Sequence, residues 1–407
     1  MDNPNKKQCR ENDGVDIISN LPEEIKENIL GRLPTDEAVR TSVLSSQWRT
    51  TWMSVPELLF VCPITHLVEN ENEVLKINSR FNKLVDKALS MHNGAIRKVT
   101  LSISAGSCNC LDQWMQILAN NGIQDLCIKN QQMDQKYTLP LSFYTCHSLI
   151  YVHLHGCIFE QLPPAFSGFR VLHTLYLKDF HASDDDLLRL IRSCPSLEKL
   201  HLKWLTGVQT ICVNAPRLRV LTIKNCYFTQ IDLDTPSLEY AWFNLNRFSS
   251  VASQANTVTK TFGCLSRIKE LHIHGLFLKF IGDKFTSTCN GLEILNLRMD
   301  IRDKKEITAV LRILKSSPML KELTIKIHCD SDLRNNNTDV WNSQQNISLN
   351  HLEFAEIKNF DESEPAYAIL KLLISSAPVL KNIYIKGSSG GPQALDRILE
   401  KLSQTEG

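Results

Sequence analysis

The chain lacks any long apolar stretch and has almost no net charge. No run of about 18 apolar residues is present, and the N-terminus has no apolar signal-peptide core, so neither a membrane span nor secretion is predicted. The 45 lysines and arginines are balanced by 44 aspartates and glutamates, which gives a formal net charge of +1 at pH 7. Such a chain has no overall attraction for nucleic acid or a membrane surface. We expect an intracellular protein, in the nucleus, the cytoplasm or both, that binds neither.

The motifs of common enzyme classes are also missing. The sequence has no glycine-rich phosphate-binding loop, no nucleophile elbow and no zinc-hydrolase helix motif. Its 13 cysteines show none of the paired spacings of a zinc site, and Cys108-x-Cys110 stands alone. His153-x-His155 and His272-x-His274 would each share a strand face, but no carboxylate or cysteine completes a metal site. The sequence therefore predicts no catalytic residue, no cofactor and no metal.

What the chain does contain begins with three short amphipathic helices. The first is expected to start near Leu21, with Pro22 in its first turn, where the missing proline N–H costs nothing. Apolar residues at four-residue spacing form one stripe along this helix, made of Leu21, Ile25, Ile29 and Leu33. Pro34 ends the first helix, a second follows it, and a third is expected from about residue 46 to 55.

Three helices in about 40 residues cannot bury a large core, so apolar side chains on their outer faces need a partner. These residues resemble an F-box, the module that docks on the Skp1-type adaptor of a cullin–RING ubiquitin ligase. The resemblance covers residues 15–61 and includes two Leu-Pro pairs, a Val-Leu-Ser and a Trp-Arg-x-x-Trp. One departure is Ser46-Gln47, where relatives usually have Lys-Arg, and the loss of two positive charges would weaken docking. The resemblance implies that the following residues bind the adaptor or hold the helices that do: Leu21, Pro22, Ile25, Ile29, Leu33, Val43, Leu44, Trp48, Arg49 and Trp52.

An internal repeat dominates the rest of the chain. A large aliphatic residue is followed by a second three positions later and by a third two positions after that. The pattern occurs twelve times, from Ile96-Val99-Leu101 to Leu380-Ile383-Ile385. Successive copies start about 20 to 31 residues apart, a range that includes the period of leucine-rich repeats. Cys157 and Cys226 occupy the Asn/Cys position of the repeat consensus, so we expect both to be buried rather than reactive.

The return segments between the predicted strands differ in character. Three of them are expected to be helical, namely 184–191, 306–314 and 365–374. The segment 206–216 is too short and too rich in β-forming residues for much helix. Trp341, the Leu349-x-x-Leu352-Glu353 sequence and the residues up to Leu380 resemble the FBD segment of plant proteins that also contain an F-box and leucine-rich repeats. Such a segment would close the exposed end of the repeats.

The predicted fold class is α/β. It comprises a three-helix F-box, an irregular leucine-rich-repeat solenoid, or horseshoe, with parallel strands on its concave face, and a C-terminal FBD cap. The predicted parts are a disordered tail (1–14), the F-box (15–61), a helical linker (62–95), the repeats (96–330), a polar loop (331–346), the FBD or terminal repeats (347–388) and a C-terminal tail (389–407).

The repeat phase also predicts which side chains face the concave surface, because side chains alternate along a strand. The position after the third aliphatic residue is Lys, Arg or His in nine of the twelve repeats, whereas about two are expected from the overall composition. The exceptions are Ser102, Asn244 and Ala355, and the adjacent outward position is rich in rings. We predict target-binding residues in these two rows: Lys129, His155, Lys178, Lys203, Lys224, His274, Arg298, Lys326, Tyr176, His201 and Trp242.

A basic row beside a ring-rich row suits an acidic or phosphorylated segment. Lysines at strand ends also keep exposed sheet edges soluble without binding anything. The order of modules predicts the substrate-recognition subunit of a Skp1–cullin–F-box ubiquitin ligase. It would bind a Skp1-like adaptor, and through it the cullin, while the repeats hold an unknown target close to the ubiquitin carried by other subunits. Two alternatives stay open: an F-box/LRR scaffold outside a ligase, and a receptor whose horseshoe binds a small anionic ligand.

Overall fold

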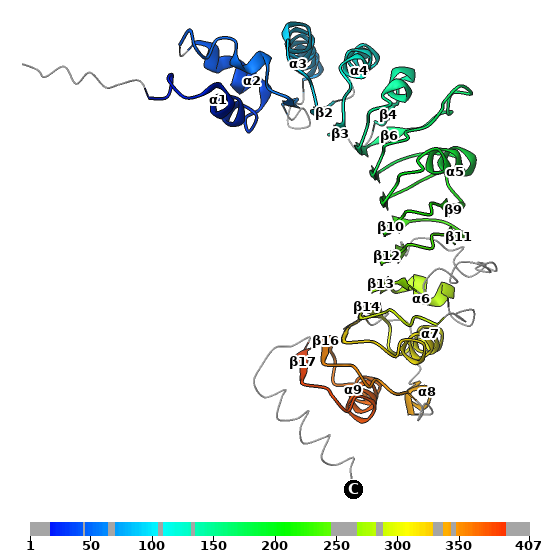
Figure 1. Ribbon diagram of the computed structural model, residues 1–407. Helices are drawn as coiled ribbons and strands as arrows, with labels where there is room; N and C mark the ends of the chain where they lie inside the picture. Colours follow the sequence, from blue (N-terminus) through cyan, green and yellow to red (C-terminus); the bar gives the residue numbers. More distant parts are fainter. Residues whose placement is uncertain are drawn as a thin grey trace, which may run out of the picture.

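The computed structural model describes residues 17–43, 45–63, 70–104, 109–131, 135–245, 267–281, 288–328, 337–342 and 347–387. These residues form one arc, with strands along its inner side and helices along most of its outer side (Figure 1). Both predicted tails lie outside the described residues. No helix in the described ranges is long and apolar enough to cross a bilayer.

The inner side of the arc is a single sheet of 13 parallel strands. Each of the twelve predicted repeats supplies one strand, which confirms the repeat pattern, and β1 adds one more at the F-box end. The strands are β1 (Glu57–Val61), β2 (Lys98–Ile103), β3 (Asp125–Asn130), β5 (Tyr151–His155), β7 (Thr174–Lys178), β8 (Lys199–Lys203), β10 (Val220–Cys226), β12 (Tyr240–Leu245), β13 (Glu270–His274), β14 (Ile294–Met299), β15 (Glu322–Ile327), β16 (Phe354–Phe360) and β17 (Asn382–Gly387).

The outer side is helical toward both ends and extended in the middle (Figure 1). The three return segments expected to be helical are helices, and the segment 206–216 contains a strand that pairs in parallel with the next return strand. The outer elements are α3 (Glu71–Met91), α4 (Leu111–Asn120), β4 (Tyr137–Thr138), η4 (Leu141–Thr145), β6 (Cys157–Ile158), α5 (Asp184–Arg192), β9 (Thr210–Asn214), β11 (Gln230–Asp234), α6 (Leu276–Ile281), α7 (Lys304–Lys315), α8 (Thr338–Asn342) and α9 (Glu364–Ser376).

The N-terminal module contains α1 (Glu23–Leu30), α2 (Thr35–Arg40) and two 3-10 turns, η1 (Thr41–Val43) and η2 (Thr51–Met53). The third helix is shorter than predicted, because residues 46–50 form turns. Hydroxyl side chains explain the difference. Thr51 Oγ1 donates to Glu23 Oε1 (2.6 Å) and Ser54 Oγ to Glu27 Oε1 (2.6 Å), so this segment is tied to α1 rather than to a helical ladder of its own.

The phase of β16 differs from the prediction. The predicted aliphatic set was Leu349-Leu352-Phe354, but Ala355 pairs with Leu323 and Ile357 with Ile325, so the set is Leu352-Ala355-Ile357. Ala355 is therefore buried and does not face the concave surface. An alanine carries little apolar signal, and the larger neighbouring phenylalanine shifted the predicted phase by three residues.

Part of the stretch predicted as a polar loop, 331–346, is helix α8. Trp341 on this helix is buried, and its Nε1 donates to the carbonyl oxygen of Ile301 (3.3 Å). Burial of one large ring therefore holds α8 onto the outer layer of the repeats. Residues 329–336 and 343–346 lie outside the described ranges.

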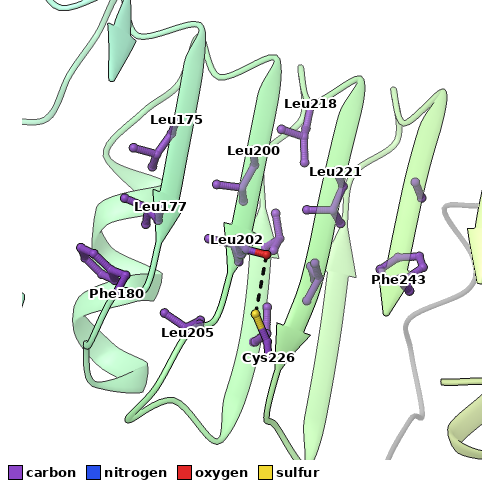
Figure 2. Close-up of a cluster of buried hydrophobic side chains, with 14 of the residues drawn as sticks. Leu175, Leu177, Phe180, Leu200, Leu202, Leu205, Leu218, Leu221, Cys226 and Phe243 are labelled. Carbon is purple, nitrogen blue, oxygen red and sulfur yellow. Dashed lines mark hydrogen bonds between the residues drawn. The ribbon is translucent and has the colours of Figure 1, made fainter. Parts of the chain in front are cut away.

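The core between the sheet and the outer layer is a stack of aliphatic side chains from successive strands (Figure 2). Cys226 lies within it, and its Sγ donates to the carbonyl oxygen of Leu202 (3.6 Å). Burial raises the pKa of the Cys226 thiol to about 12, and the pKa of the buried Cys157 thiol is raised as well. Both cysteines are thus packing residues that stay protonated, as predicted.

Candidate protein-binding surfaces

Helix α1 turns an apolar face to solvent. Ile25 and Ile29 are 47% and 41% exposed, whereas Lys26 and Leu30, about 100° around the helix, are buried. Val43, at the end of η1, is 87% exposed. Large aliphatic side chains that are exposed on a small module are typical of protein-binding surfaces.

Polar contacts hold the inner face of α1 in place. Thr51 and Ser54 donate hydrogen bonds to Glu23 and Glu27 of this helix, and the bond from Thr51 lowers the pKa of Glu23. Trp48 and Trp52 are buried inside the module. The exposed isoleucines are therefore not needed to attach the helix, which leaves them free for a partner.

The ten residues predicted for adaptor binding thus divide into groups. Five of them are exposed: Pro22, Ile25, Ile29, Val43 and Arg49. Two more, Leu21 and Leu33, are half-buried. The two tryptophans hold the helices together, and Leu44 lies outside the described residues.

Ile17 and Ile18 were missed, although both are exposed. Ser19 Oγ donates to Ser45 Oγ (3.2 Å), which places these isoleucines beside the segment that carries Val43. Their signal in the sequence was a pair of adjacent isoleucines ahead of the first Leu-Pro.

Strand pairing and hydrogen bonds join the F-box to the sheet. Strand β1 pairs with β2, and the backbone N–H of Leu59 donates to Thr35 Oγ1 (3.0 Å). On the other side, His92 Nε2 lies 2.9 Å from the carbonyl oxygen of Val55. The same spacing of apolar residues occurs once more at this junction, at Val55, Leu58 and Phe60. This thirteenth copy of the repeat was overlooked in the sequence.

Strand pairing aligns most of the predicted target-binding residues on the concave sheet. Lys358 takes the place predicted for Ala355, so from β3 to β17 every member of this row except Asn244 is Lys, Arg or His, whereas β2 contributes the uncharged Ser102. We call this set the cation row: Lys129, His155, Lys178, Lys203, Lys224, Asn244, His274, Arg298, Lys326, Lys358 and Lys386.

The charge of the cation row comes from its lysines and arginine. Burial lowers the pKa of His274 to about 4, with a smaller effect from Arg298, and burial lowers the pKa of His155 as well. Both imidazoles are therefore neutral at pH 7. His201 in the neighbouring row behaves in the same way, with its pKa lowered to about 4 by burial and by nearby lysines.

The neighbouring row carries stacked rings. His153 and Tyr176 have ring centroids 4.2 Å apart, and Trp242 stacks on His272 at 4.5 Å with an interplanar angle of 12°. Tyr176 also contacts His201 at 5.3 Å. The concave surface is thus built from a row of cations beside a row of aromatic rings, both presented by rigid strands.

Comparison with known proteins agrees with this architecture. A family model for the LRR repeats of the FBD-associated F-box protein At5g56370 matches residues 111–325, and the F-box domain model matches residues 18–60. The F-box/FBD/LRR-repeat protein At1g13570 of Arabidopsis thaliana is 28% identical over 403 residues, 95% of either chain. The probable FBD-associated F-box protein At1g32375 of the same plant is 24% identical over 421 residues, 96% of this chain and 97% of its own length.

An F-box joined to a leucine-rich-repeat sheet defines the class of F-box/LRR proteins. Within that class, the repeat model alone matches more than half of the 407 residues. The chain therefore belongs to the plant family of F-box/FBD/LRR-repeat proteins, in agreement with the resemblance seen in the sequence. F-box domains in general bind Skp1-like adaptors.

Proposed function

We propose that this chain is the substrate-recognition subunit of a Skp1–cullin–F-box ubiquitin ligase. The observation that carries the proposal is the solvent exposure of three large aliphatic side chains on the F-box, Ile25, Ile29 and Val43. These side chains would bind the Skp1-like adaptor, and through it the cullin. The inner sheet of the arc would hold a target protein, because curved repeat sheets present extended concave binding surfaces.

The chain would act by proximity and without chemistry of its own. A target held on the sheet reacts at high effective concentration with ubiquitin carried elsewhere in the complex. The rigid junction between the F-box and β1 supports this role, since it fixes the sheet relative to the adaptor. A loosely tethered target would lose part of that advantage.

The adaptor interface is tested by replacing exposed residues only. In the double variant Ile25→Asp, Ile29→Asp, we expect affinity for a Skp1-type adaptor to fall at least about 100-fold, since each buried isoleucine contributes roughly 1.5 kcal/mol or more. The matched control is Ile374→Asp, Val379→Asp, which changes two equally exposed residues (49% and 45%) near the other end of the arc. Calorimetric titration of adaptor into each full-length variant gives the affinities.

The control variant should bind the adaptor like the wild type, and both variants should keep the wild-type circular dichroism spectrum. Wild type that is folded yet does not bind the adaptor would contradict the proposal. So would equal losses in both variants. The buried Trp48 and Trp52 are unsuitable targets, because their removal would disrupt the module itself.

A second candidate function is a protein-binding scaffold that works outside a ligase. Ser46 and Gln47, which stand where F-box relatives usually have Lys-Arg, are both exposed and favour it. If they weaken a real adaptor interface, Ser46→Lys, Gln47→Arg should tighten adaptor binding several-fold at low salt and less at high salt. A scaffold would show no adaptor binding in either form, measured by the same titration.

A further inference from the structure

Three lysines at the centre of the cation row form no ion pair with any residue that the structure describes. Lys178, Lys203 and Lys224 lie on adjacent strands β7, β8 and β10 and are aligned in register. No carboxylate of the described residues lies within 4.0 Å of their ammonium groups, whereas Lys358 and Lys386 at the end of the row both pair with Glu356 (3.0 and 2.8 Å). Since neighbouring strands are about 4.8 Å apart, the three charges repel one another. An anionic partner would relieve this repulsion.

Each of the three ammonium groups is positioned over an aromatic ring. Lys178 lies 5.1 Å from the ring centroid of Trp204, Lys203 lies 4.8 Å from that of Tyr176, and Lys224 lies 2.9 Å from that of Trp242. Such contacts restrict the long lysine side chains before any ligand arrives. Less conformational entropy is then lost on binding. The lysines and rings together form a prearranged patch rather than a mobile solvated edge.

Trp204 stands out at the edge of this patch. It is 43% exposed, whereas the other five tryptophans, all within the described ranges, are buried or half-buried. Its φ is +50°, at the turn position that Gly156 and Asn225 occupy in other repeats. A bulky residue in this left-handed region is disfavoured by roughly 1–2 kcal/mol. Exposed tryptophans in strained turns are typical of contact residues.

Unused polar groups lie beside the lysines. His153 Nε2 and Trp242 Nε1 are buried and have no hydrogen-bond partner among the described residues. Buried polar atoms in folded proteins are nearly always paired, so these two atoms have hydrogen-bonding capacity that the described residues leave unused. The ammonium group of Lys224 lies over the ring of Trp242, so the unpaired indole N–H of Trp242 is next to a cation.

We propose that Lys178, Lys203, Lys224 and Trp204 bind an acidic peptide segment of the target protein. The segment would place successive carboxylates on the three ammonium groups and an apolar side chain against the Trp204 ring. Charge complementarity favours this occupant, since the patch holds three cations that have no ion-pair partner in the described part of the chain, whose overall net charge is only +1. The inference deepens the proposed function, because the segment would belong to the target, but binding of the segment itself requires no adaptor.

The test uses the full-length chain and a fluorescein-labelled peptide with six consecutive glutamates followed by a leucine. Fluorescence anisotropy at low salt should show saturable binding that is lost when the glutamates are replaced by glutamines. We expect Lys178→Gln, Lys203→Gln, Lys224→Gln to weaken binding at least 10-fold. The matched control, Lys269→Gln, Lys321→Gln, Lys381→Gln, removes three lysines from the other edge of the sheet, and binding should change less than twofold.

Trp204→Asn supplies an independent variant. Asparagine tolerates the left-handed backbone, so the melting temperature should not fall, while peptide affinity should drop several-fold. The Ile25→Asp, Ile29→Asp variant should bind the peptide like the wild type, which separates failure of this inference from failure of the adaptor proposal. Three outcomes would overturn the inference: no binding by folded wild type, equal losses in both lysine triplets, or binding only when the glutamates are replaced by phosphoserines.

Discussion

At the scale of single residues, Glu306 is a carboxylate buried in the outer layer of the arc. The backbone N–H of Asp300 donates to Glu306 Oε2 (2.7 Å), and Lys279 Nζ lies 3.5 Å from Oε1. Burial raises the pKa of Glu306 to about 7 despite both contacts. Between pH 4.5 and 7 the folded protein therefore holds a proton that the unfolded chain has released. The contribution of this residue to the free energy of unfolding must fall as the pH rises through that window.

Replacing the carboxyl group isolates this effect. Relative to wild type, the variant Glu306→Gln should become more stable as the pH is raised from 4.5 to 7, by up to about 3 kcal/mol. Urea unfolding at pH 5 and pH 7.5 measures the difference. Glu322→Gln, at an exposed position, is the control and should show no such trend. A pH-independent difference for Glu306→Gln would mean that the carboxylate is already ionised at pH 5.

At the scale of elements, the edge of the sheet opposite the cation row carries charges of alternating sign. The residue just before each of eight consecutive strands is acidic in one strand and basic in the next, and backbone hydrogen bonds join neighbours in the series. The set is Glu198, Arg219, Glu239, Lys269, Glu293, Lys321, Glu353 and Lys381. Ion pairs follow, such as Arg219 with Glu239 (3.1 Å) and Lys321 with Glu293 (3.0 Å). The alternation favours one pairing register over slipped ones.

A charge reversal within this series should destabilise the sheet. Glu293→Lys would place three cations in succession, with Lys269 and Lys321 on either side, and should lower the free energy of unfolding by about 1 kcal/mol. The effect should shrink in 1 M salt, where exposed charges are screened. Glu322→Lys is the matched control, because its register partners Ile294 and Phe354 carry no charge. Equal destabilisation by the two variants, measured by urea unfolding, would disprove a role for the alternation.

The elements also show what sequence reasoning can reach. The spacing of the aliphatic residues predicted twelve strands of the sheet. It did so because a strand that buries one face must have apolar residues at alternate positions. The same reasoning failed at β16, where the small Ala355 carries no strong signal, and at β1, which lay inside the F-box motif. It also could not orient the first helix. Ile25 and Ile29 face solvent because hydroxyl and carboxylate contacts, which have no periodicity, fix the other side of α1.

At the scale of the whole molecule, the F-box lies at one end of the arc and the FBD segment at the other (Figure 1). The exposed isoleucines lie on α1, at the β1 end of the sheet. The central lysines lie on β7, β8 and β10, which are the fifth, sixth and seventh strands of the sheet counted from β1. Since neighbouring strands are about 4.8 Å apart, the two surfaces are separated by about 20 Å or more. A partner on one surface would leave the other open, which is the geometric requirement for a subunit that bridges two proteins.

The measurement that tests this account most directly is the affinity of the acidic peptide for the chain alone and for the chain saturated with a Skp1-type adaptor. Our account predicts a ternary complex, with the same dissociation constant for the peptide in both titrations within about twofold, because the two surfaces are separate. Mutually exclusive binding, in which the adaptor displaces the peptide, would contradict the claim that this chain brings an adaptor and a target together.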